Sequence, residues 1–442
     1  LTTISNFYLG SNMCGFTAIV GDKTNLQDSL NKMNYRGIPG HESYHSEGHI
    51  HIAHTRLPIV NLEARQPAQY GPNIGFLVGE IFNYKELYPE VDTDTLAATK
   101  MFFDRGLHGF HQFDGFWSFV SIRKGELYAV TDYLGQKPIY YRTDMMAVAS
   151  EPEALLAYGP SAWDDAFFSN VLKWGYDPTG RTPWKHIKQL PPGHFWCNGY
   201  IQQYWHWEYV DELPLREGLL KATANRLLGD RPVACLLSGG LDSSIVFGLC
   251  KQLNANIESF HIENQEEEFA KLVDPNTKAM PLHGLSYDTA LQFHQSPVDL
   301  GSVYPQAILA KAVRAQGYHV VLTGDGADEL FGGYDRILKY DSQGSDVFTE
   351  LPYYHLPRLD RLMMRQTVEL RTPFLAPYVV KHALDLSLLP RTKKSCLKEA
   401  FRDILPLEVL QREKKALKIL RFKSKDNCIN FRKNHDQRSL SV

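Results

Sequence analysis

The chain has 442 residues, a hydrophobic fraction of 43%, a charged fraction of 22% and a formal net charge of -3. This length is too great for one ordinary core and predicts two or three domains, and the composition is typical of a globular protein. The near-neutral charge gives no overall attraction to nucleic acid or to an anionic membrane, and no apolar stretch approaches the ~20 residues that cross a bilayer.

The six cysteines are scattered without CxxC pairs, which favours a reducing, cytoplasmic setting. Residues 1–13 lack the charged and apolar regions of a signal peptide. We therefore expect a cytoplasmic protein whose partners are small molecules, with no nucleic acid and no membrane among them.

Residues 14 to about 205 alternate between short apolar strands and turns. Such spacing predicts packed, largely antiparallel sheets, with one helix across 94–105 and another near 151–157. The sequence therefore predicts an α+β domain over residues 14–208. The predicted strands are 15–22, 48–56, 75–84, 116–122, 125–133, 139–143, 146–151 and 193–199.

From about residue 210 the pattern changes to strand-length apolar runs that alternate with helical segments. One predicted helix, 305–316, has Pro305 at its start and Gly317 just past its end. This alternation predicts a buried parallel sheet with helical crossovers, and we assign it to an α/β domain over residues 209–425. Its predicted strands are 232–237, 257–262 and 319–324.

The tail from Arg412 is basic and has few structure signals. Because aromatic residues do not alternate with its charges, a solvated helix that frays is favoured over a nucleic-acid-binding arm. We treat residues 426–442 as a basic tail and assign it no function.

The stretch SGGLDSS, 238–244, follows an apolar run, and a helix is expected to begin within it at about Asp242. Glycines let backbone N–H groups approach an anion, serine hydroxyls add donors, and the helix N-terminus adds positive partial charge. Asp242 would repel a phosphate but suits Mg²⁺ held against phosphates. The stretch therefore predicts a phosphate site, although it matches neither the kinase P-loop nor GxGxxG; an ordinary strand–turn–helix junction is the alternative.

SGGLDSS resembles the pyrophosphate loop of the ATP pyrophosphatases, which split ATP into AMP and pyrophosphate while they adenylate a carboxylate or similar oxygen. LTGDGADELFGGY, 322–334, and MCG, 13–15, resemble the glutamine-dependent asparagine synthetases, and this similarity spans roughly residues 13–415. It implies a class II glutamine amidotransferase domain with the N-terminal nucleophile fold, an α+β αββα sandwich. An α/β ATP-pyrophosphatase domain, adenine nucleotide α-hydrolase-like with a parallel sheet, would follow.

In that family the cysteine after the initiator methionine attacks the side-chain amide of glutamine, and here that residue is Cys14. The reaction needs a thiolate, and a free α-amine on the same residue can accept the thiol proton without a histidine partner. We therefore expect residues 1–13 to be an extension that is absent from the mature protein.

The resemblance also implies a glutamine pocket. Arg56, in AHTRLPIV, would bind the α-carboxylate, as suits a bidentate guanidinium, whereas a surface ion pair is the alternative. Glu80 and Asp94 would hold the α-ammonium, and Val60 belongs to the same pocket.

The chain departs from the family at the oxyanion hole. Family members have NGEIYN where this chain has VGEIFN, so Val78 replaces an asparagine that supplies half of the hole and only the Gly79 N–H is left. Losing one such donor typically costs on the order of 10²–10³ in rate. We therefore expect weak glutaminase activity unless another donor substitutes.

The histidines of GHIHIAH, 48–54, raise the alternative of a metal site. Strand alternation puts His49 and His51 on one face and His54 on the other. Solvent-facing side chains are therefore favoured over metal ligands.

For the second domain the resemblance implies that aspartate and MgATP form β-aspartyl-AMP. Ammonia from the first domain would cross an internal tunnel and displace AMP, giving asparagine, glutamate, AMP and pyrophosphate. ATP and Mg²⁺ are the expected cofactors, with Asp242 as the metal ligand. Asp325 would deprotonate ammonia or support the adenylate, and its shorter carboxylate replaces the glutamate of many relatives.

Lys394 matches the family lysine that neutralises charge on the α-phosphate and leaving pyrophosphate, with Lys393 and Lys398 close in sequence. Arg412 and Lys414 match a further basic motif. For Leu236 and Ile262, plain core positions are the alternative. The residues expected to bind ATP are Leu236, Ser238, Gly239, Gly240, Asp242, Ser243, Ser244, Ile262, Thr323 and Gly324.

Two further departures concern the acceptor. Residues 296–305 lack the arginine–alanine–serine stretch that some asparagine synthetases place near aspartate, and Ala376 stands where relatives have PFLD. A related amidotransferase or cyclising amide synthetase that acts on another carboxylate, with weak or ammonia-only nitrogen use, is therefore the alternative to a glutamine-hydrolysing asparagine synthetase. A non-catalytic glutamine- or nucleotide-binding regulator is a third interpretation, and a homodimer is kept open.

Overall fold

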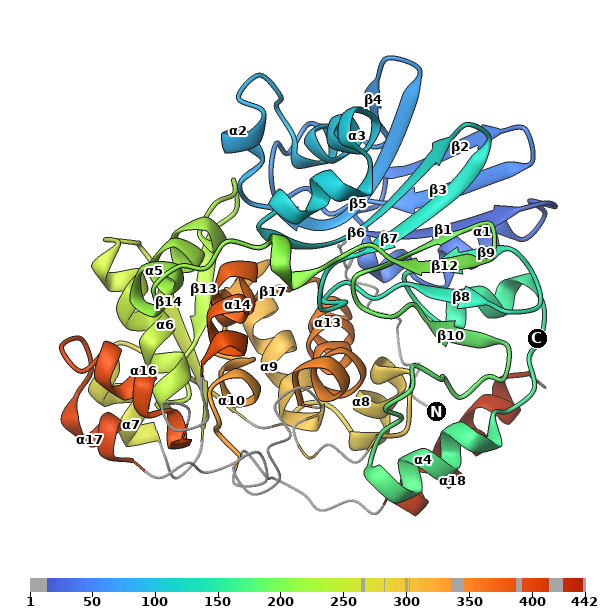
Figure 1. Cartoon of the computed structure of the whole chain (residues 1–442). Helices are drawn as coiled ribbons and strands as arrows, with labels where there is room; N and C mark the ends of the chain where they lie inside the picture. The colour runs from blue at the N-terminus through green and yellow to red at the C-terminus, as the bar shows by residue number, and fades with distance from the viewer. Residues whose placement is uncertain are drawn as a thin grey trace.

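The computed structural model describes residues 14–263, 267–281, 283–298, 301, 303–334, 346–386, 392–412 and 424–439 (Figure 1). Within these residues two antiparallel sheets and one parallel sheet form the framework. The antiparallel sheets lie together at the top of Figure 1, and the parallel sheet with its helices lies below them.

The first antiparallel sheet has the strand order β10-β8-β9-β1-β3-β2. β1 pairs on one side with β3, where Phe16 lies opposite His54, and on the other side with β9. The strands are β1 Gly15–Val20, β2 Glu42–Glu47, β3 Ile50–Thr55, β8 Tyr140–Arg142, β9 Ala147–Ala149 and β10 Ile187–Gln189.

The second antiparallel sheet has the order β12-β11-β7-β6-β5-β4. Its longest pairing joins β5 to β6, with Gly79 opposite Trp117. The strands are β4 Ala68–Tyr70, β5 Asn73–Ile81, β6 Gly115–Arg123, β7 Glu126–Thr131, β11 His194–Cys197 and β12 Tyr200–Gln203.

These two sheets pack face to face over one apolar cluster to which both contribute, including Phe16 and Ile52 from the first and Phe76 and Val120 from the second. α1 (Leu26–Asn31) covers the outer face of the first sheet, α4 (Asp165–Trp174) adds side chains to the same apolar cluster, and α3 (Asp94–Arg105) covers the outer face of the second sheet. The αββα layering is confirmed.

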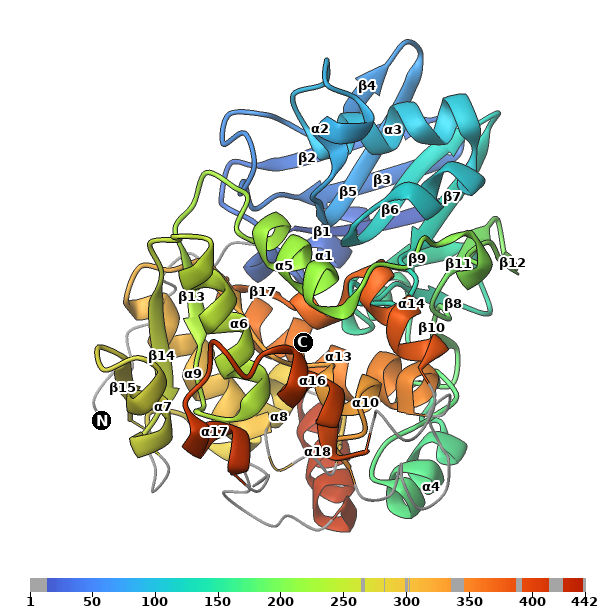
Figure 2. The same ribbon diagram turned by 60° about the vertical axis from the view of Figure 1, so that its left-hand side comes forward.

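The parallel sheet has the order β15-β14-β13-β16-β17, and each neighbouring pair runs parallel. Helices cover both of its faces, as a buried parallel sheet requires (Figure 2). The α/β class is therefore confirmed. The strands are β13 Val233–Leu236, β14 Glu258–Ile262, β15 Lys278–Met280, β16 Val320–Leu322 and β17 Glu369–Arg371.

The helices that accompany this sheet begin and end close to the predicted positions. The helix predicted at 305–316 is α9, Val303–Ala315, and the helix predicted to begin within SGGLDSS begins at Leu241. The others are α5 Leu215–Arg226, α6 Leu241–Gln252, α7 Glu267–Val273, α8 Tyr287–His294, α10 Ala327–Leu330, α13 Leu356–Met364, α14 Pro377–Asp385, α16 Ser395–Ala400 and α17 Leu407–Gln411.

The predicted helix 94–105 is confirmed as α3, whereas the one near 151–157 is the 3-10 helix Glu153–Tyr158. Six strands were not predicted, namely β2, β4, β10, β12, β15 and β17. β2, ESYHSE, is polar and largely exposed, so it carries no apolar alternation that could have indicated it.

The solvent-facing assignment of the histidines is wrong for two of them. His49 is exposed, but His51 and His54 are buried, because β3 lies between β1 and β2 and both of its faces are covered. His54 faces the inter-sheet core, where its ring centroid lies 5.5 Å from that of Phe76. Burial and the charge of Arg56 lower the pKa of His54 to about 3, so this ring is neutral.

The prediction of a solvated tail is also wrong. α18 (Ser424–Ser439) packs on α4, with Cys428 and Phe431 buried in the apolar cluster beneath the first sheet. The Arg432 guanidinium lies 3.9 Å from the ring centroid of Phe168. Trp163, Phe168 and Trp184 therefore cover a face of α18 that shows no apolar pattern in the sequence. No helix in the described ranges is long and apolar enough to cross a membrane.

Candidate active sites

The first candidate site lies where β1 begins. The backbone N–H of Leu57 donates to Cys14 Sγ over 3.3 Å. Burial raises the pKa of the Cys14 thiol to about 12, against the opposing effects of Arg56 and of the Leu57 N–H. The thiol is therefore protonated near neutral pH in this environment and needs a base before it can act as a nucleophile.

Arg56 follows β3 directly and is buried. Its guanidinium donates to the carbonyl oxygens of Val60 (2.8 Å), Asn61 (3.1 Å) and Ala64. No described carboxylate forms a salt bridge with it, so the surface ion-pair alternative is wrong. Arg56 shapes the 60–64 loop, and Val60 takes part through its carbonyl oxygen.

Two buried carboxylates lie near the end of β5 and the start of α3. Asp94 accepts the N–H groups of Ile81 (3.1 Å) and Thr95 (2.7 Å), and Thr93 caps the helix. Burial raises the pKa of Asp94 to about 6, and burial together with Asp94 raises the pKa of Glu80 well above its ordinary value. Neither carboxylate forms a salt bridge within the described ranges, so the pair favours a ligand that brings a cation.

The departure from the family at position 78 is visible in the structure. Val78 is buried in the inter-sheet apolar cluster, against which Cys14 also packs, and it offers no hydrogen-bond donor. Gly79 has a φ of 103°, and a Cβ there would lie 2.0 Å from the Phe116 carbonyl oxygen. Glycine alone fits that position.

The second candidate site lies at the carboxyl ends of the parallel strands, where open α/β sheets bind ligands. Leu236 ends β13, Ile262 ends β14, and Thr323 follows β16. All three are buried and form the floor of this edge, and Leu236 and Ile262 offer no polar side-chain group.

The SGGLDSS turn is held by its own serines. The Ser238 and Ser243 hydroxyls lie 3.1 Å apart, and the Ser243 hydroxyl also bonds the Gly240 carbonyl oxygen. Ser244 is buried one residue further into α6. Gly239 adopts φ 70°, and a Cβ there would meet the Ala270 nitrogen at 2.5 Å, so the turn closes against α7. A Cβ on Gly324 would lie 2.7 Å from the Asp242 Cβ, which shows how closely the loop after β16 approaches this turn.

Lys394 joins two carboxylates at this edge. Its Nζ lies 2.5 Å from Asp242 Oδ2 and 2.5 Å from Asp328 Oδ1. Burial alone would lower the pKa of Lys394, but these two carboxylates raise it above its ordinary value. Lys393 is exposed and Lys398 is only partly buried, so Lys394 is the lysine of this segment that reaches the turn.

Sequence reasoning missed Asp328, although it lies inside the quoted LTGDGADELFGGY stretch. Its carboxylate and that of Asp242 converge on one bound ammonium group, which shows that the pair accommodates a cation. Mg²⁺ binds through one or two carboxylates together with phosphate oxygens, so this donor set fits Mg²⁺.

Asp325 is positioned by two neighbours. The Thr323 hydroxyl donates to it over 2.6 Å, and Arg358 on α13 donates over 2.8 Å. Arg358 lies far from the recognised motifs in sequence, and no pattern indicated it. Arg412 donates to the Ser238 carbonyl oxygen over 3.5 Å, whereas Lys414 lies outside the described residues.

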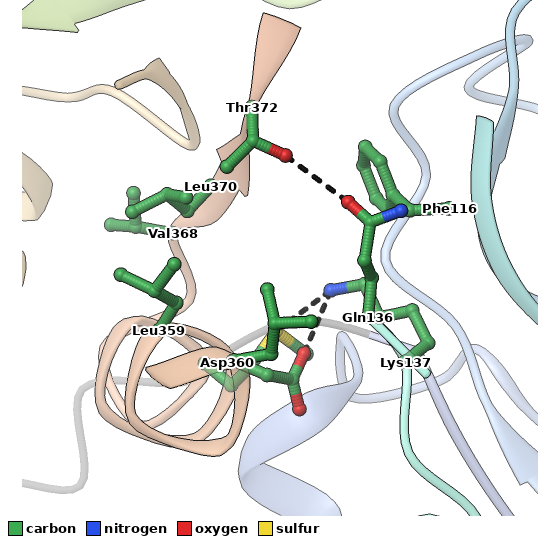
Figure 3. Close-up of a pocket in the computed structure, with 10 residues that line it drawn as sticks. Phe116, Gln136, Lys137, Leu359, Asp360, Val368, Leu370 and Thr372 are labelled. Atoms are coloured by element: carbon green, nitrogen blue, oxygen red, sulfur yellow. Dashed lines mark hydrogen bonds and ion pairs between the residues drawn. The ribbon is translucent and has the colours of Figure 1, made fainter. Parts of the chain in front are cut away.

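A cavity lies where the antiparallel-sheet region meets α13 and β17 (Figure 3). Phe116, Gln136 and Lys137 line it from the antiparallel sheets, and residues of α13 and β17 line it from the parallel-sheet region. Thr372 Oγ1 donates to Gln136 Oε1 over 3.1 Å across its upper side. The cavity thus lies at the boundary of the two halves, which a tunnel would have to cross.

Comparison with known proteins supports both halves. A family model described as a glutamine amidotransferase domain matches residues 13–207, and one described as asparagine synthase matches 214–353 and 341–431. The chain belongs to the glutamine-dependent asparagine synthetase family. Together the two models cover the sequence that holds both candidate sites.

The curated relatives are distant. The glutamine-hydrolyzing asparagine synthetase B of Escherichia coli (strain K12) is 26% identical over 483 residues, covering 91% of this chain and 81% of that protein. The nodule asparagine synthetase of Pisum sativum is 24% identical, with coverages of 91% and 77%. Asparagine synthetase 1 of Bacillus subtilis (strain 168) is 25% identical over 73% of this chain, which spans 59% of that relative.

A solved structure, the glutamine phosphoribosylpyrophosphate amidotransferase of B. subtilis with ADP and GMP, matches 57% of this chain and 61% of its own. The sequence identity is 14% and the TM-score is 0.27, too low to support an argument. The fold assignment therefore depends on the sheet topology and the family models.

Proposed function

We propose that this chain is a glutamine-hydrolysing asparagine synthetase that uses ATP and Mg²⁺. The observation that carries the proposal is the cavity at the boundary of two differently charged sites, one suited to an ammonium-bearing ligand and one suited to a metal-bound phosphate. A protein that only bound glutamine or a nucleotide would need neither the second site nor a cavity where the two halves meet.

In the first half-reaction the Cys14 thiolate attacks the side-chain amide carbon of glutamine. The tetrahedral intermediate takes up a proton on its nitrogen and expels ammonia, which leaves a γ-glutamyl thioester. Water then hydrolyses the thioester, releasing glutamate and the free Cys14 thiol. Arg56 would bind the α-carboxylate, Glu80 and Asp94 the α-ammonium, and the Gly79 N–H the oxyanion. The base would be the Cys14 α-amine, which requires Cys14 to be the first residue of the active chain.

In the second half-reaction the β-carboxylate of aspartate attacks the α-phosphorus of ATP and pyrophosphate leaves. Ammonia then attacks the acyl carbon and AMP leaves, giving asparagine. Asp242 and Asp328 would hold Mg²⁺, which would neutralise charge on the phosphates. Lys394 would stabilise the negative charge that develops on the leaving pyrophosphate. The SGGLDSS backbone would bind the pyrophosphate.

We further propose that residues 14–208 form the amidotransferase domain and 209–425 the synthetase domain, in a cytoplasmic enzyme. Six free cysteines without a disulfide in the described residues agree with a reducing setting. The acceptor is the least constrained part, because residues 296–305 lack the family arginine. A different small carboxylate is therefore the alternative acceptor.

The test is amide formation with MgATP and aspartate, with glutamine or ammonium as the nitrogen source. Asparagine with both sources is the expected result. Product with ammonium alone would show that Val78 disables the first site. No asparagine, but AMP and pyrophosphate formed with another carboxylate, would replace aspartate as the acceptor.

A further inference from the structure

Helix α13 carries charged side chains toward both sites. Arg358 bonds Asp325 at the synthetase site over 2.8 Å. Asp360 lies two residues further along, which turns its side chain to nearly the opposite side of the helix. There it faces the antiparallel-sheet region, so one short helix contacts both halves of the molecule.

Asp360 reaches the nucleophile through one residue. Its carboxylate accepts from the guanidinium of Arg36 over 3.0 and 3.4 Å, and Arg36 Nε donates to the carbonyl oxygen of Cys14 over 3.0 Å. Arg36 also pairs with Glu151 over 2.5 Å. All of these side chains are almost fully buried, so water cannot replace the contacts.

Asp360 reaches the oxyanion glycine through a second residue. Lys137 Nζ lies 2.8 Å from the Asp360 carboxylate, as Figure 3 shows at the lower edge of the cavity. A Cβ added to Gly79 would lie 3.1 Å from Lys137 Cγ, so the lysine stem packs against the Gly79 backbone. The Asp360 carboxylate thus holds two side chains, one bonded to the Cys14 carbonyl oxygen and one packed against the Gly79 backbone.

Buried ion pairs of this kind are seldom explained by stability alone, because well-packed apolar residues stabilise such an interface equally well. Although burial alone would raise the pKa of Asp360, Arg36 and Lys137 lower it below its ordinary value, so the carboxylate is charged. These ion pairs therefore fix the positions of Arg36 and Lys137 more than they add to the stability of the fold. Through Arg36, they also fix the backbone carbonyl oxygen of Cys14, the residue proposed as the nucleophile.

We propose that Asp360 is a positioning residue of the glutaminase site, supplied by the synthetase half of the chain. It holds Arg36 on the Cys14 carbonyl and Lys137 against Gly79, so glutamine hydrolysis requires α13 in its place beside Asp325. This inference depends on the proposed glutaminase function. In this proposal, helix α13 is the element through which the glutaminase site depends on the synthetase half.

The test measures glutamine hydrolysis by Asp360→Asn in the full chain. We expect kcat to fall on the order of 10²-fold, as small misplacements of reacting groups do. KM for glutamine should stay within about twofold, because Arg56, Glu80 and Asp94 are untouched, and Asp360→Glu should recover part of kcat. Asp274→Asn is the matched control: it is a buried carboxylate of the same half that bonds Ser259 and Asn276.

Arg36→Lys provides a second variant if Asp360→Asn does not fold. A single ammonium keeps the charge but cannot serve Cys14, Glu151 and Asp360 together, so the same loss of kcat is expected. Unchanged kcat in a folded variant would overturn the inference, as would an equal loss in the Asp274 control. Absence of glutaminase in the unmodified protein would instead contradict the proposed function, which is therefore measured first.

Discussion

The two candidate sites contain paired carboxylates in opposite electrostatic states. Glu80 and Asp94 are buried, form no salt bridge within the described ranges, and have raised pKa values. Asp242 and Asp328 are partly exposed and share the ammonium group of Lys394. Glu80 and Asp94 can therefore accept a cation supplied by a ligand, whereas Asp242 and Asp328 already pair with the ammonium group of Lys394.

This difference indicates what each site can receive. An ammonium-bearing ligand would relieve the buried charge of the first pair, since an unpaired buried carboxylate is costly. At the second site, Lys394 and the SGGLDSS backbone offer positive charge to phosphates, and the carboxylates remain suited to a metal. The following experiments test this division of roles, from the largest expected effect to the smallest.

Cys14→Ala should separate the two sites completely. Without the thiol no thioester forms, so glutamine-dependent amide formation should fall on the order of 10³-fold or more. Ammonium-dependent formation should persist, because Cys14 lies next to β1 in the antiparallel-sheet region and belongs to the first site alone. Steady-state amide production with each nitrogen source measures both, and loss of the ammonium reaction would contradict the separation.

Lys394→Met should disable the second site whatever the nitrogen source. Pyrophosphate release should fall on the order of 10²–10³-fold, since the developing negative charge loses a preorganised cation. Glutamine hydrolysis should remain measurable. Lys393→Met is the matched control, because that neighbouring lysine is exposed; an equal loss there would show that the segment's fold, not the ammonium, is responsible.

Val78→Asn should strengthen the first site. An amide donor beside Cys14 would restore half of an oxyanion hole and raise glutaminase kcat by up to about 10²-fold. Val120→Asn places the same amide in the same apolar cluster and controls for the cost of burying it. If both variants lose activity alike, the apolar packing at position 78 matters more than the missing donor.

The pH profile should show the smallest effect. With a pKa of about 6, Asp94 becomes protonated as the pH falls and can no longer attract an ammonium, so kcat/KM for glutamine should drop about tenfold per unit below pH 6. The raised pKa also means that the folded state binds this proton more tightly than the unfolded chain. The contribution of Asp94 to stability is therefore largest at low pH and is lost as the pH rises from 3.8 to 6. Asp94→Asn should remove this step from the profile.

Sequence reasoning predicted the fold class because local signals agree with it. Apolar alternation marked β1, β3, β5 and β6, and continuous apolar runs marked β13, β14 and β16. Short polar strands such as β2 have no such signal, since their position is set by pairing with β3. The buried face of α18 was missed because its partners lie far away in the sequence; Phe168, for example, lies more than 250 residues before Arg432.

The candidate site residues came from motifs, and the structure brings them together at two places. What could not be predicted are the contacts between distant segments. Asp328 was within reach of sequence reasoning, but Arg358 and Asp360 gain their meaning only when α13 is packed between the two halves. Such salt bridges leave no recognisable pattern in the sequence, because their partners lie far apart in the chain and charged residues occur in every kind of element.

The central claim is that the two sites form one enzyme through the space between them. Glutamine labelled with ¹⁵N in its side-chain amide, supplied with MgATP, aspartate and an excess of unlabelled ammonium, tests it directly. Mass spectrometry of the amide product should show ¹⁵N well above the fraction present in the ammonium pool. Label diluted to the level of that pool would mean that ammonia escapes to solvent and that the two sites work independently.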